Sequence, residues 1–177
     1  MTSRHLDLAA RWMQQQGRGY YTIGSSGHEG NAAVAAAMRP TDPALLHYRS
    51  GAFYVRRAGQ VPGIDPVRDV LYGVAGAAQE PIVGGRHKVF GRHELAIIPQ
   101  TSTIASHLPR AVGVAFAIER ARKLGVDSPW PKDAVAVASV GDASMNHSTA
   151  VGALNTACLA CPVPEPVSRG PGRHFRV

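Results

Sequence analysis

An acidic turn follows the most apolar segment of the chain. Residues 134–140 read Ala-Val-Ala-Val-Ala-Ser-Val and lead directly into Gly141-Asp142-Ala143-Ser144. An aspartate at the end of a buried strand is well placed to hold Mg²⁺, which takes one or two carboxylates and fills its other positions with water and phosphate oxygens. A helix that begins after the turn would add backbone N–H groups, which suit a diphosphate. The same residues also suit a simple helix cap.

Two further stretches carry residues that bind phosphates or cations. In His47-Tyr48-Arg49 the guanidinium fork and the phenol hydroxyl suit a phosphate, although a surface arginine beside a half-buried tyrosine has the same sequence. Residues 98–109 place several hydroxyl groups between two prolines, just before an expected helix. This segment suits a cation or a cofactor ring, and it equally suits ordinary helix capping.

Histidines and cysteines are the remaining reactive side chains. A loop histidine can exchange protons near neutral pH, and it can equally have a structural role. Cys158 and Cys161 form one Cys-x-x-Cys pair at the end of an alanine-rich helix, which we interpret as incidental thiols because zinc needs about four ligands. The histidines near the stretches above are His28, His47, His87, His93 and His107.

The hydrophobic pattern predicts the elements that position these residues. Strands are expected over 44–47 and 134–140, the second covered on both faces as in a parallel sheet. Residues 79–103 have little periodicity and are expected to form a long loop. Strands alternating with helices indicate an α/β fold with a doubly wound parallel sheet, in which ligands bind at the carboxyl ends of the strands. Helices are expected over 4–16, 28–38, 66–72, 109–124 and 146–159.

The composition is that of a globular domain, with 45% hydrophobic and 18% charged residues. No apolar run approaches the roughly 20 residues that span a bilayer, so no membrane partner is expected. The start of the chain lacks an apolar signal segment, which favours a cytoplasmic location. The net charge of +7 suits an anionic ligand. Aromatic and basic residues are not interleaved, and we expect no nucleic-acid partner.

The character of the chain changes after Cys161. Prolines recur at positions 162, 164, 166 and 171, and a central strand cannot tolerate them. We therefore expect residues 1–161 to form one partial domain. Residues 162–177 are expected to form a disordered or aberrant tail, the product of a frameshift or truncation.

Taken in order, these stretches resemble the alpha subunit of the decarboxylating component of 2-oxo acid dehydrogenase complexes, of the branched-chain (2-oxoisovalerate) type. The resemblance covers residues 1 to about 160. It is carried by the glycine-rich turn 20–30, Thr41-Asp42, Tyr48-Arg49, the loop that begins at Gly84-Gly85-Arg86, the segment 102–113, and Gly141-Asp142, which begins the family's bipartite thiamine-diphosphate motif.

The resemblance implies a thiamine-diphosphate-binding fold, incomplete at its C-terminal side, with thiamine diphosphate and Mg²⁺ as cofactors. It implies oxidative decarboxylation of a 2-oxo acid, with the acyl group passed to a lipoyl acyltransferase partner. A beta subunit, or a beta region of the same enzyme, would hold the rest of the cofactor. The alternatives are a pyruvate-type alpha subunit, and a non-catalytic phosphate- or nucleotide-binding module or inactive fragment.

The resemblance also implies roles for individual residues. Tyr48 and Arg49 would contact the diphosphate, and Asp142 would bind Mg²⁺. His87 and His93 flank the position of the proton-donating histidine of the mobile loop. The other cofactor-binding positions would be Ser102, Ile104, Gly141, Ala143 and Asn146. Ser102, Ser106 and His107 fall where some relatives bind a structural potassium ion, with His107 in place of an amide.

The sequence departs from the family pattern in two places. Ala143 stands where the family has a third glycine, a change that the backbone tolerates if φ is negative there. The asparagines that close the motif further downstream have no counterpart in 162–177. We therefore expect the isolated chain to be inactive and to bind thiamine diphosphate weakly or not at all.

Overall fold

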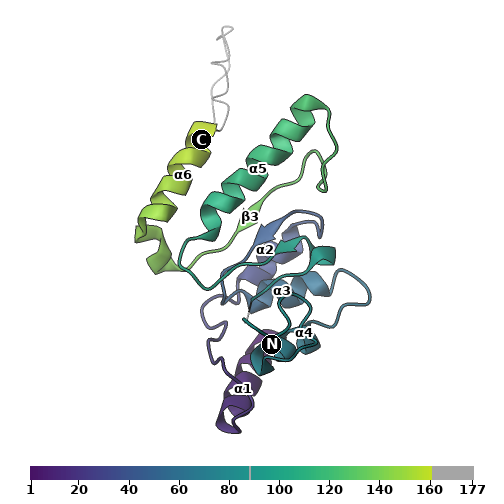
Figure 1. Cartoon of the computed structure of the whole chain (residues 1–177), viewed down its shortest axis with the longest axis vertical. Helices are drawn as coiled ribbons and strands as arrows, with labels where there is room; N and C mark the ends of the chain where they lie inside the picture. The colour runs from purple at the N-terminus through teal and green to yellow at the C-terminus, as the bar shows by residue number, and fades with distance from the viewer. Residues whose placement is uncertain (88, 161–177) are drawn as a thin grey trace, which may run out of the picture.

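The computed structural model describes residues 1–87 and 89–160. In Figure 1, α1 lies at one end of the molecule, and the helices α5 and α6 lie side by side at the other end. The elements in chain order are α1 (Thr2–Gln15), α2 (Asn31–Ala37), β1 (Ala44–Leu45), α3 (Gly51–Ala58), α4 (Pro66–Ala75), the 3₁₀ helix η1 (His93–Leu95), β2 (Ile97–Ile98), α5 (His107–Leu124), β3 (Val137–Ala138), the 3₁₀ helix η2 (Asp142–Asn146) and α6 (Ser148–Ala160).

Within the described residues, three parallel strands form the sheet, in the order β2-β1-β3. In register, Ala44 lies opposite Ile97 on one side and opposite Val137 on the other. The chain leaves β1 toward one edge to form β2, and then crosses to the other edge to form β3. Connections on the two sides of β1 therefore diverge, and in doubly wound sheets this divergence opens a crevice at the carboxyl ends of the strands.

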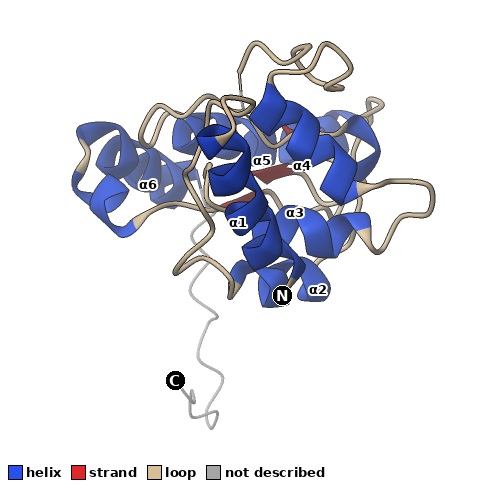
Figure 2. Cartoon of the chain, turned by 90° about the horizontal axis from the view of Figure 1, so that it is seen from below, coloured by secondary structure: helices blue, strands red, loops and turns tan. Residues whose placement is uncertain are grey.

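Helices cover both faces of this sheet, whose short strands are drawn in red among the blue helices in Figure 2. Ala44 and Leu46 join the main hydrophobic core with Phe53 of α3, and Val137 of β3 packs against the same core. Ala136 and Ala138, which flank Val137 along the chain, face the side of α5 instead. This alternation follows from the two-residue period of a strand, and it confirms the α/β fold expected from the sequence.

The helix α3 has no counterpart among the predicted elements. Six of its eight residues are buried and only Arg56 is exposed, so the helix presents little of the polar face that makes a surface helix recognisable in sequence. Phe53 is 1% exposed and Arg57 is fully buried beneath its ring, with the guanidinium carbon 4.6 Å from the ring centroid. Such a helix belongs to the core of the domain.

Two predictions around the sheet are wrong. Residues 79–103 do not form one continuous loop, because they contain η1 and the strand β2, whose Ile97 is buried against β1. Residues 134–140 are not a strand buried on both faces. Pairing is limited to Val137 and Ala138, which are partly exposed, and Val135 is 55% exposed, since β3 is an edge strand of the described sheet.

The other predicted helices are present with shifted ends. The helix expected from residue 28 begins at Asn31, and the one expected from 146 begins at Ser148. Helix α4 begins after Asp65, whose carboxylate accepts the N–H groups of Val67 and Arg68, as an N-cap should. Cys158 is exposed on α6, whereas Cys161 and the predicted tail 162–177 lie outside the described residues.

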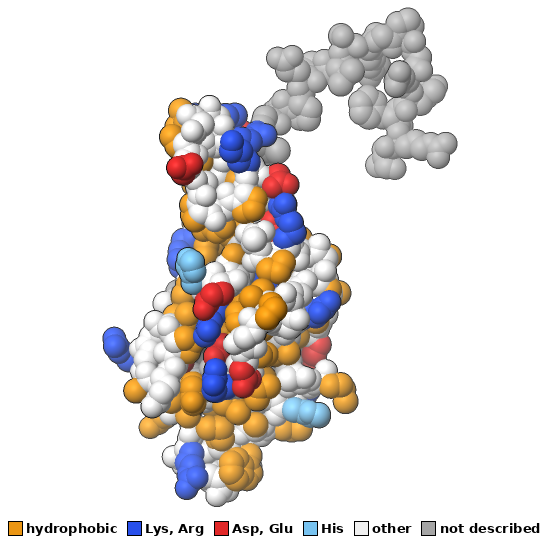
Figure 3. All heavy atoms as spheres, turned by 90° about the vertical axis from the view of Figure 1, so that its right-hand side faces the viewer, with side chains coloured by type: hydrophobic (Ala, Val, Ile, Leu, Met, Phe, Trp, Pro, Cys, Tyr) orange, Lys and Arg blue, Asp and Glu red, His pale blue; other side chains and the backbone are white. Residues whose placement is uncertain are grey.

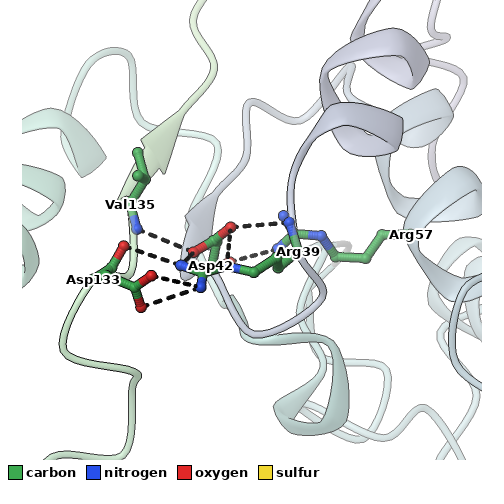
Figure 4. A network of polar contacts seen from close by, with 5 residues as sticks. All are labelled: Arg39, Asp42, Arg57, Asp133 and Val135. Carbon is green, nitrogen blue, oxygen red and sulfur yellow. Dashed lines mark hydrogen bonds and ion pairs between the residues drawn. The ribbon is translucent and has the colours of Figure 1, made fainter.

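A polar clamp holds the amino ends of the strands together (Figure 4). The buried Asp42 accepts hydrogen bonds from the Arg39 guanidinium and from the Val135 N–H, while Arg39 also pairs with Asp133. Arg57 donates to the carbonyl oxygens of Asp42 at 2.7 Å and Leu95 at 3.2 Å. Burial alone would raise the pKa of Asp42, but its hydrogen bonds from Arg39 and Val135 hold that pKa below its ordinary value.

The surface shows no single concentration of charge on the face in Figure 3, where basic and acidic side chains lie scattered among hydrophobic ones. Among the helices of residues 1–87 and 89–160, none combines the length and the hydrophobicity that crossing a membrane requires.

Candidate functional site

A cavity of about 740 Å³ opens at the carboxyl ends of β1 and β3. Its wall is built by the turn before α2, by the residues that follow β1, and by those that follow β3. This is the crevice that the strand order β2-β1-β3 predicts. The lining residues are Ser26, Gly27, His28, Gly30, Asn31, His47, Tyr48, Arg49, Ile104, Val140, Gly141, Asp142, Ala143 and Ser144.

Opposite charges meet in this cavity. Arg49 follows β1, and Asp142 is the first residue of η2 after β3. The Arg49 guanidinium is half-buried and makes one long hydrogen bond, to the Ser26 carbonyl oxygen at 3.5 Å. Asp142 is exposed and lines the same cavity. A ligand with a phosphate group and a bound divalent cation would find a donor fork on one side and a hard oxygen ligand on the other.

Two stacked histidines form part of the cavity wall. The rings of His28 and His47 lie 5.0 Å apart, with planes 8° from parallel, and the Tyr48 ring lies 3.9 Å from that of His47. His47 is buried, and its Nδ1 accepts the Arg49 N–H at 3.3 Å, so that nitrogen carries no proton. Burial, and then the nearby His28, His107 and Arg49, lower the pKa of His47 to about 4.

Of the two stacked histidines, His28 is the one whose ring nitrogens are unpaired within the described residues. Its ring is near enough to Arg49 and Asp142 for both charges to affect it. Burial lowers the pKa of His28, and Arg49 lowers it further, while Asp142 and Glu29 act in the opposite direction. The sequence indicated His28 only as one of several histidines near the candidate stretches. Its stacking on His47 was not predicted, because the two residues belong to different parts of the chain.

A network of partly buried hydrogen bonds supports the cavity wall. The Ser139 hydroxyl accepts the His47 N–H at 2.9 Å and lies 2.8 Å from the Ser50 hydroxyl. Asn31, the first residue of α2, donates to Ser50 at 3.1 Å. The Ser139 carbonyl oxygen lies 2.7 Å from Nε2 of His107. Ser139, which directly follows β3, thus connects the ends of four elements.

The segment before α5 brings a hydrophobic side chain to the cavity. Ala105 adopts a left-handed conformation with φ of 60°, which is uncommon for a residue other than glycine. The chain reverses there, so that Ala105 is buried while its neighbour Ile104, 47% exposed, lines the cavity. An exposed isoleucine at this position offers an apolar contact to the part of a ligand that lies above the phosphate.

The turn after β3 differs from the one expected. The residues after Gly141 form the short 3₁₀ helix η2, and α6 begins only at Ser148, so the N-terminus of a long helix does not face the cavity. Ala143 does not have a positive φ. Within the described chain, the residues other than glycine that do are Ala96 and Ala105. Its methyl group therefore fits the turn without backbone strain.

The structure brings together six of the predicted cofactor-binding residues. Tyr48, Arg49, Ile104, Gly141, Asp142 and Ala143 all line the cavity. Ser102 and Asn146 do not; Ser102 contacts His87 instead, with 3.5 Å between Oγ and Nε2.

The two candidate proton donors fall in different places. His87 lies between two hydroxyl groups, with Nδ1 3.2 Å from the Tyr21 hydroxyl and Nε2 toward Ser102. His93 is exposed on η1, which precedes β2 and so lies at the amino end of the sheet, away from the cavity. Neither histidine lines the cavity, and His87 is the one joined to the segment that does, through Ser102.

The described residues contain no cluster of three or more His, Cys, Asp or Glu side chains that would hold a metal by themselves. Asp142 therefore stands alone as a carboxylate in the cavity wall. One carboxylate suits Mg²⁺ when the ligand supplies phosphate oxygens, because Mg²⁺ keeps waters and takes few protein ligands.

Comparison with known proteins finds a matching family and a curated relative. Residues 1–163 match the family described as Dehydrogenase E1 component. The chain is 29% identical over 154 residues to the mitochondrial 2-oxoisovalerate dehydrogenase subunit alpha of Caenorhabditis elegans. That alignment covers 85% of this chain and 32% of the relative, so the chain spans about a third of the length of the curated protein it matches.

Proposed function

Because the chain belongs to the Dehydrogenase E1 component family, we propose that it holds the diphosphate side of thiamine diphosphate, with Mg²⁺, in a branched-chain 2-oxo acid dehydrogenase. The observation that carries this proposal is the meeting of Arg49 and Asp142 across one cavity at the ends of β1 and β3. The name of the nematode relative favours a branched-chain substrate over pyruvate.

Six of the residues that line the cavity have a proposed task. The Arg49 fork and the Tyr48 hydroxyl bind diphosphate oxygens, and Asp142 gives one oxygen to Mg²⁺. Gly141 and Ala143 let the backbone of the turn approach the diphosphate, and Ile104 packs against the cofactor above it. When bound, thiamine diphosphate supplies the carbanion that attacks the 2-oxo group and accepts electrons as carbon dioxide leaves.

Further proposals concern proton transfer and partners. Of the two candidate histidines, His87 is better placed to deliver a proton, since Tyr21 and Ser102 both orient its ring. We propose that a beta subunit or beta region covers the open side of the cavity, and that the acyl group passes to a lipoyl acyltransferase. Without that beta partner, we expect the chain to be inactive and to bind thiamine diphosphate weakly or not at all.

Ligand-observed NMR on the full chain tests the proposal, since it detects weak binding. Thiamine diphosphate should bind in a Mg²⁺-dependent way and in preference to thiamine and to ADP. Asp142→Asn should remove the Mg²⁺ dependence, and Arg49→Ala should weaken binding at every Mg²⁺ concentration. Asp127→Asn and Arg56→Ala change exposed residues outside the cavity and serve as matched controls.

Two outcomes would contradict the proposal. Equal or tighter binding of ADP would favour a nucleotide-binding module. Binding of thiamine diphosphate that neither Asp142→Asn nor Arg49→Ala affects would place the cofactor elsewhere on the chain.

A further inference from the structure

The buried histidine at the start of α5 ties two parts of the site together. His107 is 3% exposed, and its Nε2 lies 2.7 Å from the carbonyl oxygen of Ser139. A carbonyl oxygen can only accept, so Nε2 carries the proton and donates. Burial lowers the pKa of His107 and so favours the neutral ring, although the Ser139 carbonyl acts in the opposite direction.

The hydrogen bond from His107 ends on Ser139, which also supports the cavity wall at the end of β1. Besides its carbonyl oxygen, Ser139 offers the hydroxyl that accepts the His47 N–H and contacts Ser50. His107 therefore links the segment that carries Ile104 to the end of β3, and through Ser139 to the end of β1.

Potassium does not fit the residues of this segment. Such an ion needs several oxygens turned toward one point, because hard cations prefer oxygen ligands. His107 instead turns an N–H toward the Ser139 carbonyl. Ser106 directs its hydroxyl to the Thr103 carbonyl at 3.0 Å, and Ser102 directs its own toward His87.

We propose that His107 is a positioning residue that replaces a monovalent cation. Its Nε2–H gives the Ser139 carbonyl the positive partner that an ion would otherwise supply, and it fixes residues 99–106 against β3. The chain then needs no potassium to hold this side of the cavity. This proposal refines the proposed function, but its test uses the ligand-free protein, so failure of one does not imply failure of the other.

Thermal unfolding of the full chain in potassium, sodium and tetramethylammonium chloride at matched ionic strength tests this proposal. The wild-type melting temperature should be the same in all three salts. His107→Ala should lower it by about 2–6 °C, whereas His107→Gln, which keeps an N–H donor, should lose less than half as much. His5→Ala, at an exposed position on α1, is the matched control and should have no effect.

A second measurement serves if His107→Ala does not fold. In a ¹H–¹⁵N spectrum of the wild-type imidazoles, a slowly exchanging Nε2–H signal should persist without potassium and disappear in His107→Gln. A specific rise of the wild-type melting temperature in potassium would overturn the proposal. So would an His107→Gln variant as unstable as His107→Ala, or a wild-type spectrum without the Nε2–H signal.

Discussion

The imidazole rings of His28 and His47 stack 5.0 Å apart, although one residue precedes α2 and the other follows β1. Two rings this close favour the neutral form, because a second positive charge beside the first is unfavourable. His47 is also held neutral by its surroundings, since its Nδ1 accepts the Arg49 N–H. This part of the cavity wall is therefore most stable at a pH at which both imidazole rings are neutral.

Acid should destabilise the fold through His47. The unfolded chain takes up this proton below pH 6.5, whereas the folded chain does so only near a pKa of about 4. The free energy of unfolding should fall as the pH falls from 6.5 to 4, by up to about 3 kcal/mol from this group. Urea unfolding across this range measures it. His47→Gln should flatten the slope and His5→Gln should not; equal slopes in all three proteins would contradict the assignment.

The clamp at the amino ends predicts a large difference between two aspartates. The Asp42 side chain is 4% exposed, while that of Asp133 is 77% exposed, and both pair with Arg39. Asp42→Ala should lower the free energy of unfolding by about 2–4 kcal/mol, because buried donors lose their acceptor. Asp133→Ala should lower it by no more than about 1 kcal/mol. Urea unfolding compares the two, and similar losses would show that the contacts of Asp42 do not stabilise the strands.

Two adjacent glycines in the loop after α4 allow the cost of backbone strain to be measured apart from the cost of steric overlap. Gly84 and Gly85 both have positive φ, of 59° and 72°. A Cβ on Gly84 would meet nothing closer than 3.6 Å, whereas a Cβ on Gly85 would overlap the backbone of Gly76. Gly84→Ala should cost about 1 kcal/mol and Gly85→Ala about 3 kcal/mol or more. Thermal unfolding measures both, and equal losses would mean that the loop moves to accept the methyl group.

Restoring the family's third glycine should bring no benefit. Because Ala143 does not have a positive φ, Ala143→Gly removes no strain and adds flexibility to the unfolded chain. We expect a loss of about 0.5–1 kcal/mol in stability and unchanged binding of thiamine diphosphate by NMR. An affinity gain of about threefold or more would show that the methyl group obstructs the ligand.

The sequence predicted that the polar residues following β1 and β3 lie at one edge of a parallel sheet, where such sheets bind ligands. Both strands are nevertheless shorter than the expected 44–47 and 134–140. The sequence did not predict α3, whose buried surroundings leave little of a polar face to detect. Strand β2 is two residues long and has no periodicity to read. The contacts of His28 and His107 were not predicted either. Their partners lie on other elements, and no pattern along the chain indicates such contacts.

The pairing of β1 with β3 is short, yet four hydrogen bonds run along it. Val137 and Ser139 donate to the carbonyl oxygens of Pro43 and Leu45, as in any parallel pair. Side chains extend the series at both ends, where Asp42 accepts the Val135 N–H and Ser139 accepts the His47 N–H. A shift of one residue would break both outer bonds, so these two side chains specify the register of the strands. Since Arg49 and Asp142 follow those strands, the same two side chains set the spacing between the guanidinium and the carboxylate.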